Sequence, residues 1–88
     1  MAKKKRQLLG RFIVADPEIC HGKPTFIGSR VMVWQVLRRV AKGQPWDEIV
    51  ADWPRSVTKE AIAEALLLAA RTFEDYAAIH TDQVQLLA

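Results

Sequence analysis

The chain has 88 residues, half of them hydrophobic and 26% charged, which limits it to one domain with a modest core. This composition excludes a disordered chain, the single cysteine excludes an intrachain disulfide, and no apolar run approaches the roughly 20 residues that span a bilayer. The net charge of +3 conceals an asymmetry: residues 1–42 carry ten Lys and Arg against two acids, and residues 43–88 carry three against eight. This asymmetry predicts an anionic partner, with nucleic acid as the leading candidate and a merely solubilising basic tail as the alternative.

The basic N-terminus, MAKKKRQLLG, is not followed by the apolar core or cleavage site of a signal peptide, so we expect a cytoplasmic protein. Residues 1–10 show no periodicity and are predicted to be a flexible basic arm. Residues 11–14 and 30–33 are short, apolar and β-branched. They are predicted to be two short strands or extended segments, which pair with each other or with a second copy of the chain.

The segment PEICHGKPTFIGSR, residues 17–30, joins these two predicted strands and has no helical rhythm. Its Gly-Lys pair lacks the upstream glycine of a P-loop, and Pro24 removes an amide that a phosphate cradle needs, which argues against nucleotide binding. We interpret the segment as a rigid connection in which Gly22 and Gly28 allow the turns.

Cys20 and His21 are the conceivable nucleophile and base of this segment. Adjacent residues in an extended segment project to opposite faces, which argues against a hydrogen bond between them. As metal ligands they have only His80 and scattered acids to complete a site. We therefore expect no catalytic residue, no metal and no cofactor, and we interpret Cys20 as a small buried hydrophobic residue.

From Val33 the period becomes helical and continues to Gly43, a residue that commonly ends helices. The predicted apolar face consists of Val33, Trp34, Leu37, Val40 and Ala41, and the opposite face of Gln35, Arg38, Arg39 and Lys42. All three tryptophans, Trp34, Trp46 and Trp53, fall on predicted apolar faces. We therefore expect them to pack in the core rather than to stack on bases.

A second helix is predicted from Pro45, which suits a first turn, to Pro54, which ends it. A third begins after Thr58, a typical N-cap, and should be the longest, at about 20 residues. Its apolar stripe recurs at spacings of 4, 3, 4 and 3 and consists of Ile62, Leu66, Ala69, Phe73 and Tyr76. Additional aliphatic residues widen this surface beyond one stripe, which calls for a second partner.

Three helices joined by short turns predict a mainly α fold, a trihelical helix-turn-helix bundle of homeodomain-like or winged-helix-like type, preceded by a short N-terminal β element. The helix after Thr58 takes the place of the recognition helix. Its leading exposed residues, Lys59, Glu60, Ala63 and Glu64, include two acids and are poorly suited to DNA. The arm and the basic face of the first helix are better candidates, although that face could equally be a solvated surface at a helix C-terminus.

The ordered motifs of the chain resemble those of the domain-of-unknown-function 433 family over roughly residues 12–70. They are Asp16-Pro17, Cys20-His21-Gly22-Lys23-Pro24, Ile27-Gly28-Ser29-Arg30, the helix end from Leu37 to Gly43, and Trp53-Pro54. The resemblance implies a small helix-turn-helix fold with an N-terminal β element. It also implies an antitoxin-like role, because some relatives resemble VapB-type antitoxins encoded beside a toxin with a PIN-like ribonuclease fold.

The sequence and the resemblance together predict a homodimeric, DNA-binding antitoxin that represses its own operon and neutralises a partner toxin. The alternative is a protein-interaction module without specific DNA binding. We expect a basic arm at 1–10, a single domain at 11–80 and a C-terminal tail at 81–88. The predicted DNA-binding residues are Lys3, Lys4, Lys5, Arg6, Arg30, Arg38, Arg39, Lys42, Arg55 and Lys59. The predicted partner-binding residues are Leu67, Leu68, Arg71, Tyr76, Ile79, Val84, Leu86 and Leu87.

Overall fold

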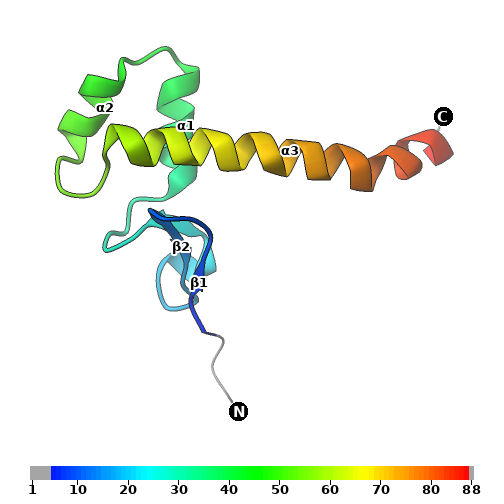
Figure 1. The fold of residues 1–88 in the computed structure, drawn as a ribbon, viewed down its shortest axis with the longest axis horizontal. Helices are drawn as coiled ribbons and strands as arrows, with labels where there is room; N and C mark the ends of the chain where they lie inside the picture. The colour runs from blue at the N-terminus through cyan, green and yellow to red at the C-terminus, as the bar shows by residue number, and fades with distance from the viewer. Residues whose placement is uncertain (1–4, 88) are drawn as a thin grey trace.

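The computed structural model describes the backbone of residues 5–87 and the side chains of residues 5–76. Three strands precede three helices, and a short 3-10 turn, η1, separates the second strand from the third (Figure 1). The elements are β1 (Gln7–Leu8), β2 (Ile13–Ala15), η1 (Cys20–Gly22), β3 (Pro24–Phe26), α1 (Val33–Ala41), α2 (Trp46–Asp52) and α3 (Lys59–Leu87). The expected mainly helical chain with an N-terminal β element is therefore confirmed.

The three strands form one antiparallel sheet in the order β1-β2-β3. In the middle strand, Val14 lies opposite Leu8 on one side and opposite Thr25 on the other. The first expected strand is thus found one or two residues late, and it pairs within the chain. Strand β1 falls inside the segment expected to be an arm, so the described fold begins earlier than the sequence indicates.

The second predicted segment, at 30–33, contains none of the three strands: it is extended at Met32 and helical from Val33. Strand β3 lies at Pro24–Phe26 instead, and of the predicted segment only Met32 makes an isolated bridge, to Thr25. The chain turns directly after β3, where the Ser29 hydroxyl donates to the Phe26 carbonyl oxygen at 2.8 Å and Gly28 has φ +80°. Val33 already belongs to α1, whose start is fixed by the Gln35 side chain accepting from the Met32 amide at 3.0 Å.

The sequence predicts an extended connection before β3, and this prediction is wrong. Cys20, His21 and Gly22 have φ values of 51°, 58° and 81°, which is the left-handed region throughout. Only glycine adopts this region readily, so the two residues with side chains store backbone strain here. The expected turns at Gly22 and Gly28 are confirmed, because both glycines have positive φ.

The core lies where the sheet and all three helices meet. Its fully buried centre consists of Ile13, Phe26, Val36, Ile49, Val57 and Ile62. Val57 and Ile62 stand on either side of the first turn of α3 and are both completely buried in this cluster, as in a hydrophobic staple. The N-cap is confirmed, because the Thr58 hydroxyl accepts from the Ala61 amide at 3.1 Å.

The face of α1 that packs on the core agrees with the predicted one at Val33, Leu37 and Val40 but not at Trp34 and Ala41. Val33 and Val36 are buried, while Trp34 is 43% exposed and Ala41 is exposed. A residue placed one position after a buried one is rotated by about 100° around the helix, which turns Trp34 away from the core. Trp46 and Trp53 do pack against the core, as expected.

Helix α3 is 29 residues long and continues past the other elements (Figure 1). It includes most of the segment expected to be a separate tail. The Cα radius of gyration is 15.3 Å, whereas a compact domain of this length has about 12 Å. The second half of α3 therefore has no other element of the described chain beside it, and Phe73 and Tyr76, expected on its apolar face, are exposed by 70% and 57%.

Candidate nucleic-acid and protein interfaces

One face of α1 carries an aromatic and basic stripe formed by Trp34, Arg38 and Lys42. These residues are spaced four apart, so they follow one another along the same side of the helix, and all three are exposed. The Arg38 guanidinium lies over the Trp34 ring, 5.5 Å from its centroid, and the indole Nε1 donates to the Met32 sulfur at 3.2 Å. An exposed ring with one cation over it and a second cation further along the same face is typical of surfaces that stack bases and contact phosphates.

The neighbouring Arg39 is committed to the fold rather than to this stripe. Its guanidinium forms an ion pair with Asp52 and lies over the Trp53 ring at 4.4 Å from the centroid. Both contacts connect α1 to the end of α2. Arg39, one of the predicted DNA-binding residues, is therefore not among the leading candidates for DNA contact.

Lys59 is also engaged within the chain. Its Nζ lies 2.6 Å from the Asp47 carboxylate, which connects the first turns of α2 and α3. The hydrogen bond to Asp47, followed by the charge of the same carboxylate, raises the pKa of Lys59 above its ordinary value. Lys59 therefore stays protonated, but the Asp47 carboxylate offsets part of the positive charge that it could present to a phosphate.

The other expected DNA-binding residues are scattered over the surface. Lys5, Arg6, Arg30 and Arg55 are exposed and come from the N-terminal segment, the turn before α1 and the turn before α3. Lys3 and Lys4 lie outside the described residues. Lys5 and His21 line a shallow hollow of about 400 Å³, bounded also by Gln7, Ala15, Pro17 and Gly22.

Glu64 was expected among the exposed residues at the start of the recognition helix, and this expectation is wrong. Its carboxylate accepts from the Arg11 and Phe12 amides, both at 2.8 Å, and so ties α3 to the turn between β1 and β2. A Cβ on Gly10 would lie 2.5 Å from the same carboxylate, so a glycine is needed there for this approach. One side of the start of α3 is therefore covered and unavailable for DNA.

Cys20 and His21 do not form a catalytic pair in this arrangement. The Cys20 thiol is half-buried and donates to the Arg30 carbonyl oxygen at 3.6 Å, so its hydrogen-bonding partner lies in the turn before α1. Among residues 5–76, no group of three or more His, Cys, Asp and Glu side chains is arranged to hold a metal ion.

The expected partner-binding residues lie along α3. Leu67 is 72% exposed, Arg71 and Tyr76 are exposed, and Leu68 is half-buried against the core. The backbone of the remaining residues belongs to α3, but the side chains of Ile79, Val84, Leu86 and Leu87 lie outside the described part of the structure. Helix α3 is long, but no helix of the described chain is apolar enough over sufficient length to cross a membrane.

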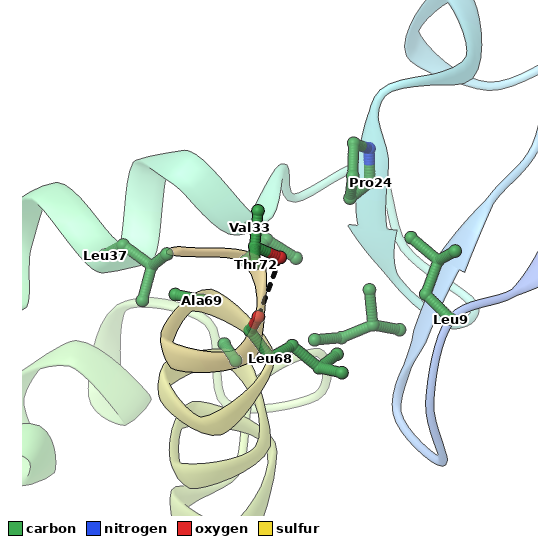
Figure 2. Close-up of a pocket in the computed structure, with 9 residues that line it drawn as sticks. Leu9, Pro24, Val33, Leu37, Leu68, Ala69 and Thr72 are labelled. Atoms are coloured by element: carbon green, nitrogen blue, oxygen red, sulfur yellow. Dashed lines mark hydrogen bonds between the residues drawn. The ribbon is translucent and has the colours of Figure 1, made fainter. Parts of the chain in front are cut away.

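An apolar groove of about 310 Å³ lies between the sheet, α1 and α3, beside the point where α3 leaves the core. Figure 2 shows Leu9 and Pro24 on the sheet side facing Leu68, Ala69 and Thr72 on α3, with α1 at the back. Only Thr72 offers a hydroxyl among these α3 residues, and that hydroxyl donates to the Leu68 carbonyl oxygen at 2.8 Å. The groove is therefore suited to apolar side chains. No local pattern in the sequence predicts this groove, because its sheet wall and its α3 wall lie more than 40 residues apart.

Comparison with known proteins gives one family. The model described as "Protein of unknown function (DUF433)" matches residues 13–69, which includes β2, β3, α1, α2 and the first part of α3. Neither the curated proteins nor the solved structures give a match.

Proposed function

The chain belongs to the DUF433 family, and we propose that it is an antitoxin-like DNA-binding regulator, which represses its own operon and neutralises a partner toxin with a PIN-like ribonuclease fold. The observation that supports DNA binding best is the exposed stripe of Trp34, Arg38 and Lys42 on α1. Within the described residues, neither Arg38 nor Lys42 forms an ion pair with a carboxylate. Both charges are available for phosphates.

In this proposal α2 and the start of α3 are the helix-turn-helix unit, but α1 makes the principal DNA contact. The exposed acid Glu60 opposes phosphate contact at the start of α3, and Glu64 is occupied by the β1–β2 turn. Helix α1 has its cations in the last turn, where the helix dipole also favours them, and the basic N-terminal segment adds further contacts.

Fluorescence anisotropy with DNA from the gene's own upstream region, over a salt series, tests the role of the stripe. We expect Arg38→Ala to weaken binding and to reduce the slope of log K against log salt concentration by about 0.9, the value for one phosphate contact. Arg71→Ala is the matched control, because it removes the same charge from an exposed position on α3. Equal affinities and slopes for the two variants would remove α1 from the DNA interface.

Loss of the ring tests stacking separately from charge. Trp34→Ala removes an exposed aromatic surface, and base stacking contributes about 1–3 kcal/mol. We expect weaker binding with an unchanged salt slope, since no charge is lost. A change of slope without a change of affinity at low salt would show that the indole acts only by positioning Arg38.

The exposed surface of α3 is the proposed binding site for the toxin. The helix projects beyond the core and exposes Leu67 and Arg71 on the side opposite the buried residues of its first half. The test is co-purification with the product of the adjacent gene and inhibition of its ribonuclease activity. Leu67→Glu should abolish both while leaving DNA binding intact; retention of inhibition would place the toxin elsewhere. Should DNA binding be absent throughout, the chain is the protein-interaction module of the alternative prediction.

A further inference from the structure

We infer that the projecting half of α3 pairs antiparallel with the same half of a second copy of this chain, so that each helix end reaches the apolar groove of the other copy. This inference concerns self-association and requires neither DNA nor a toxin. The apolar stripe of α3 is packed against the core in the first half of the helix and exposed to solvent in the second half. Ile62 and Leu66 pack in the core, whereas Phe73 and Tyr76 continue the same spacing past its end and are exposed.

The side of α3 that faces the core in its first half is therefore left without cover in its second half. Phe73 is 70% exposed, although it lies one residue after Thr72, which lines the groove. Exposed hydrophobic residues are ordinary when they are scattered singly, but here they extend a buried stripe and adjoin an apolar hollow. An exposed stripe that continues a buried one and adjoins an apolar groove indicates a surface that binds another protein.

The groove has the size and chemistry for side chains of this kind. Its volume of about 310 Å³ is roughly twice that of a 150 Å³ apolar cavity known to accept benzene. The residues on its sheet side are Leu9, Ile13 and Pro24, of which Figure 2 labels Leu9 and Pro24. The last four residues of α3 read Val-Gln-Leu-Leu in the sequence, so the chain itself carries aliphatic residues at the end of the helix that would arrive there.

Helix lengths set the register. From Phe73 to Leu87 the helix measures about 22 Å. Two such segments paired antiparallel over their whole length place the end of each beside Phe73 of the other, at the mouth of the groove. The two-fold axis then passes close to residue 80, and the contact is the same in both directions, as a closed dimer requires.

Charge favours the antiparallel arrangement of two copies over the parallel one. After Thr72 the sequence contains Glu74, Asp75 and Asp82 but no Lys or Arg. Parallel pairing would set each acid opposite its own copy, whereas antiparallel pairing sets them apart. The negative end of each helix also arrives beside the basic sheet region of the partner, where Lys23 precedes the groove residue Pro24 and is exposed.

The contact area predicts the strength of the pairing. A flank about 22 Å long and 16 Å wide, half the circumference of a 10 Å helix, covers about 350 Å² per copy before the groove is counted. A standard interface buries about 800 Å² per partner. We therefore expect a weak dimer that dissociates readily on dilution.

Sedimentation velocity of the full chain over a concentration series tests this inference. The mass should rise from 10.0 kDa towards twice that value. Phe73→Ser should raise the dissociation constant about 100-fold or more, because two phenyl rings lose their cover. Leu67→Ser is the matched control, since Leu67 is equally exposed on the other side of the helix, and it should leave the constant unchanged. A wild-type monomer at all concentrations, or equal effects of both variants, would overturn the inference.

A distance measurement tests the register independently. A spin label at Arg71→Cys, in a Cys20→Ser background, sits on an exposed position outside the groove. Antiparallel pairing about residue 80 separates the two Arg71 positions by about 30 Å, from 18 residues at 1.5 Å and an interaxial distance of 8–10 Å. A distance below about 15 Å would show parallel pairing and contradict the proposed register.

Discussion

Replacement of Glu64 by alanine should weaken the attachment of the β1–β2 turn to α3. The Glu64 carboxylate is half-buried and accepts from the Arg11 and Phe12 amides at 2.8 Å, across more than 50 residues of sequence. A hydrogen bond to a charged group contributes about 1.5–3 kcal/mol, and the bond to Arg11 is the weaker because that amide is exposed to water. We therefore expect Glu64→Ala to lower the free energy of unfolding by about 2–4 kcal/mol.

This loss is a large fraction of the stability of a small domain, which is about 5–15 kcal/mol. For a chain of this size each kcal/mol lowers the melting temperature by about 4–8 °C, so the variant should melt at least about 8 °C below the wild type. Glu64→Gln keeps one acceptor oxygen without the charge, so its melting temperature should lie between those of the wild type and Glu64→Ala. Circular dichroism at 222 nm against temperature measures all three.

Glu74→Ala is the matched control, because Glu74 is an exposed carboxylate on the same helix beyond the core. Surface substitutions of this kind change stability by less than about 0.5 kcal/mol. Amide exchange should report the same contrast locally, with the Arg11 and Phe12 amides losing protection only in Glu64→Ala. Equal melting temperatures for Glu64→Ala and Glu74→Ala would refute the reasoning.

Three further predictions concern positions around the core. Gly10→Ala should destabilise the wild type by displacing the Glu64 carboxylate but be close to neutral in Glu64→Ala, a non-additivity that a thermal double-mutant cycle measures. Thr25→Val should raise stability by about 1 kcal/mol, because the fully buried Thr25 hydroxyl has no hydrogen-bond partner among the described residues; a lower melting temperature would contradict this. NMR titration should give Lys59 a pKa above its ordinary value, falling in Asp47→Asn. Because a raised lysine pKa stabilises the fold below its unfolded value, this contribution should disappear as the pH rises through the folded pKa, and an identical Lys59 titration in both proteins would refute it.

The helices could be predicted from the sequence because their signals are local. Thr58 and Gly43 fix the start of α3 and the end of α1 through contacts within a few residues, and both act as expected. The second strand could not be placed in the same way. Residues 31–32 have the composition of a strand, but the turn at Gly28 and Ser29 brings β3 next to β2 first.

Distant contacts explain the remaining differences. Periodicity places Phe73 on the same stripe as Ile62, but it does not show that the elements that cover Ile62 end before they reach Phe73. The role of Glu64 likewise depends on a turn more than 50 residues away, so its acidic side chain suggests only solvent exposure. The exposed Trp34 was missed because a single tryptophan beside apolar residues is assigned to the core by default.

The binding of wild-type protein to DNA from its own upstream region tests the central proposal most directly. Fluorescence anisotropy should show tighter binding to this fragment than to unrelated DNA of the same length, and the preference should persist near physiological salt. Equal and steeply salt-sensitive binding to both fragments, or no binding to either, would contradict the assignment of this chain as an operator-binding regulator.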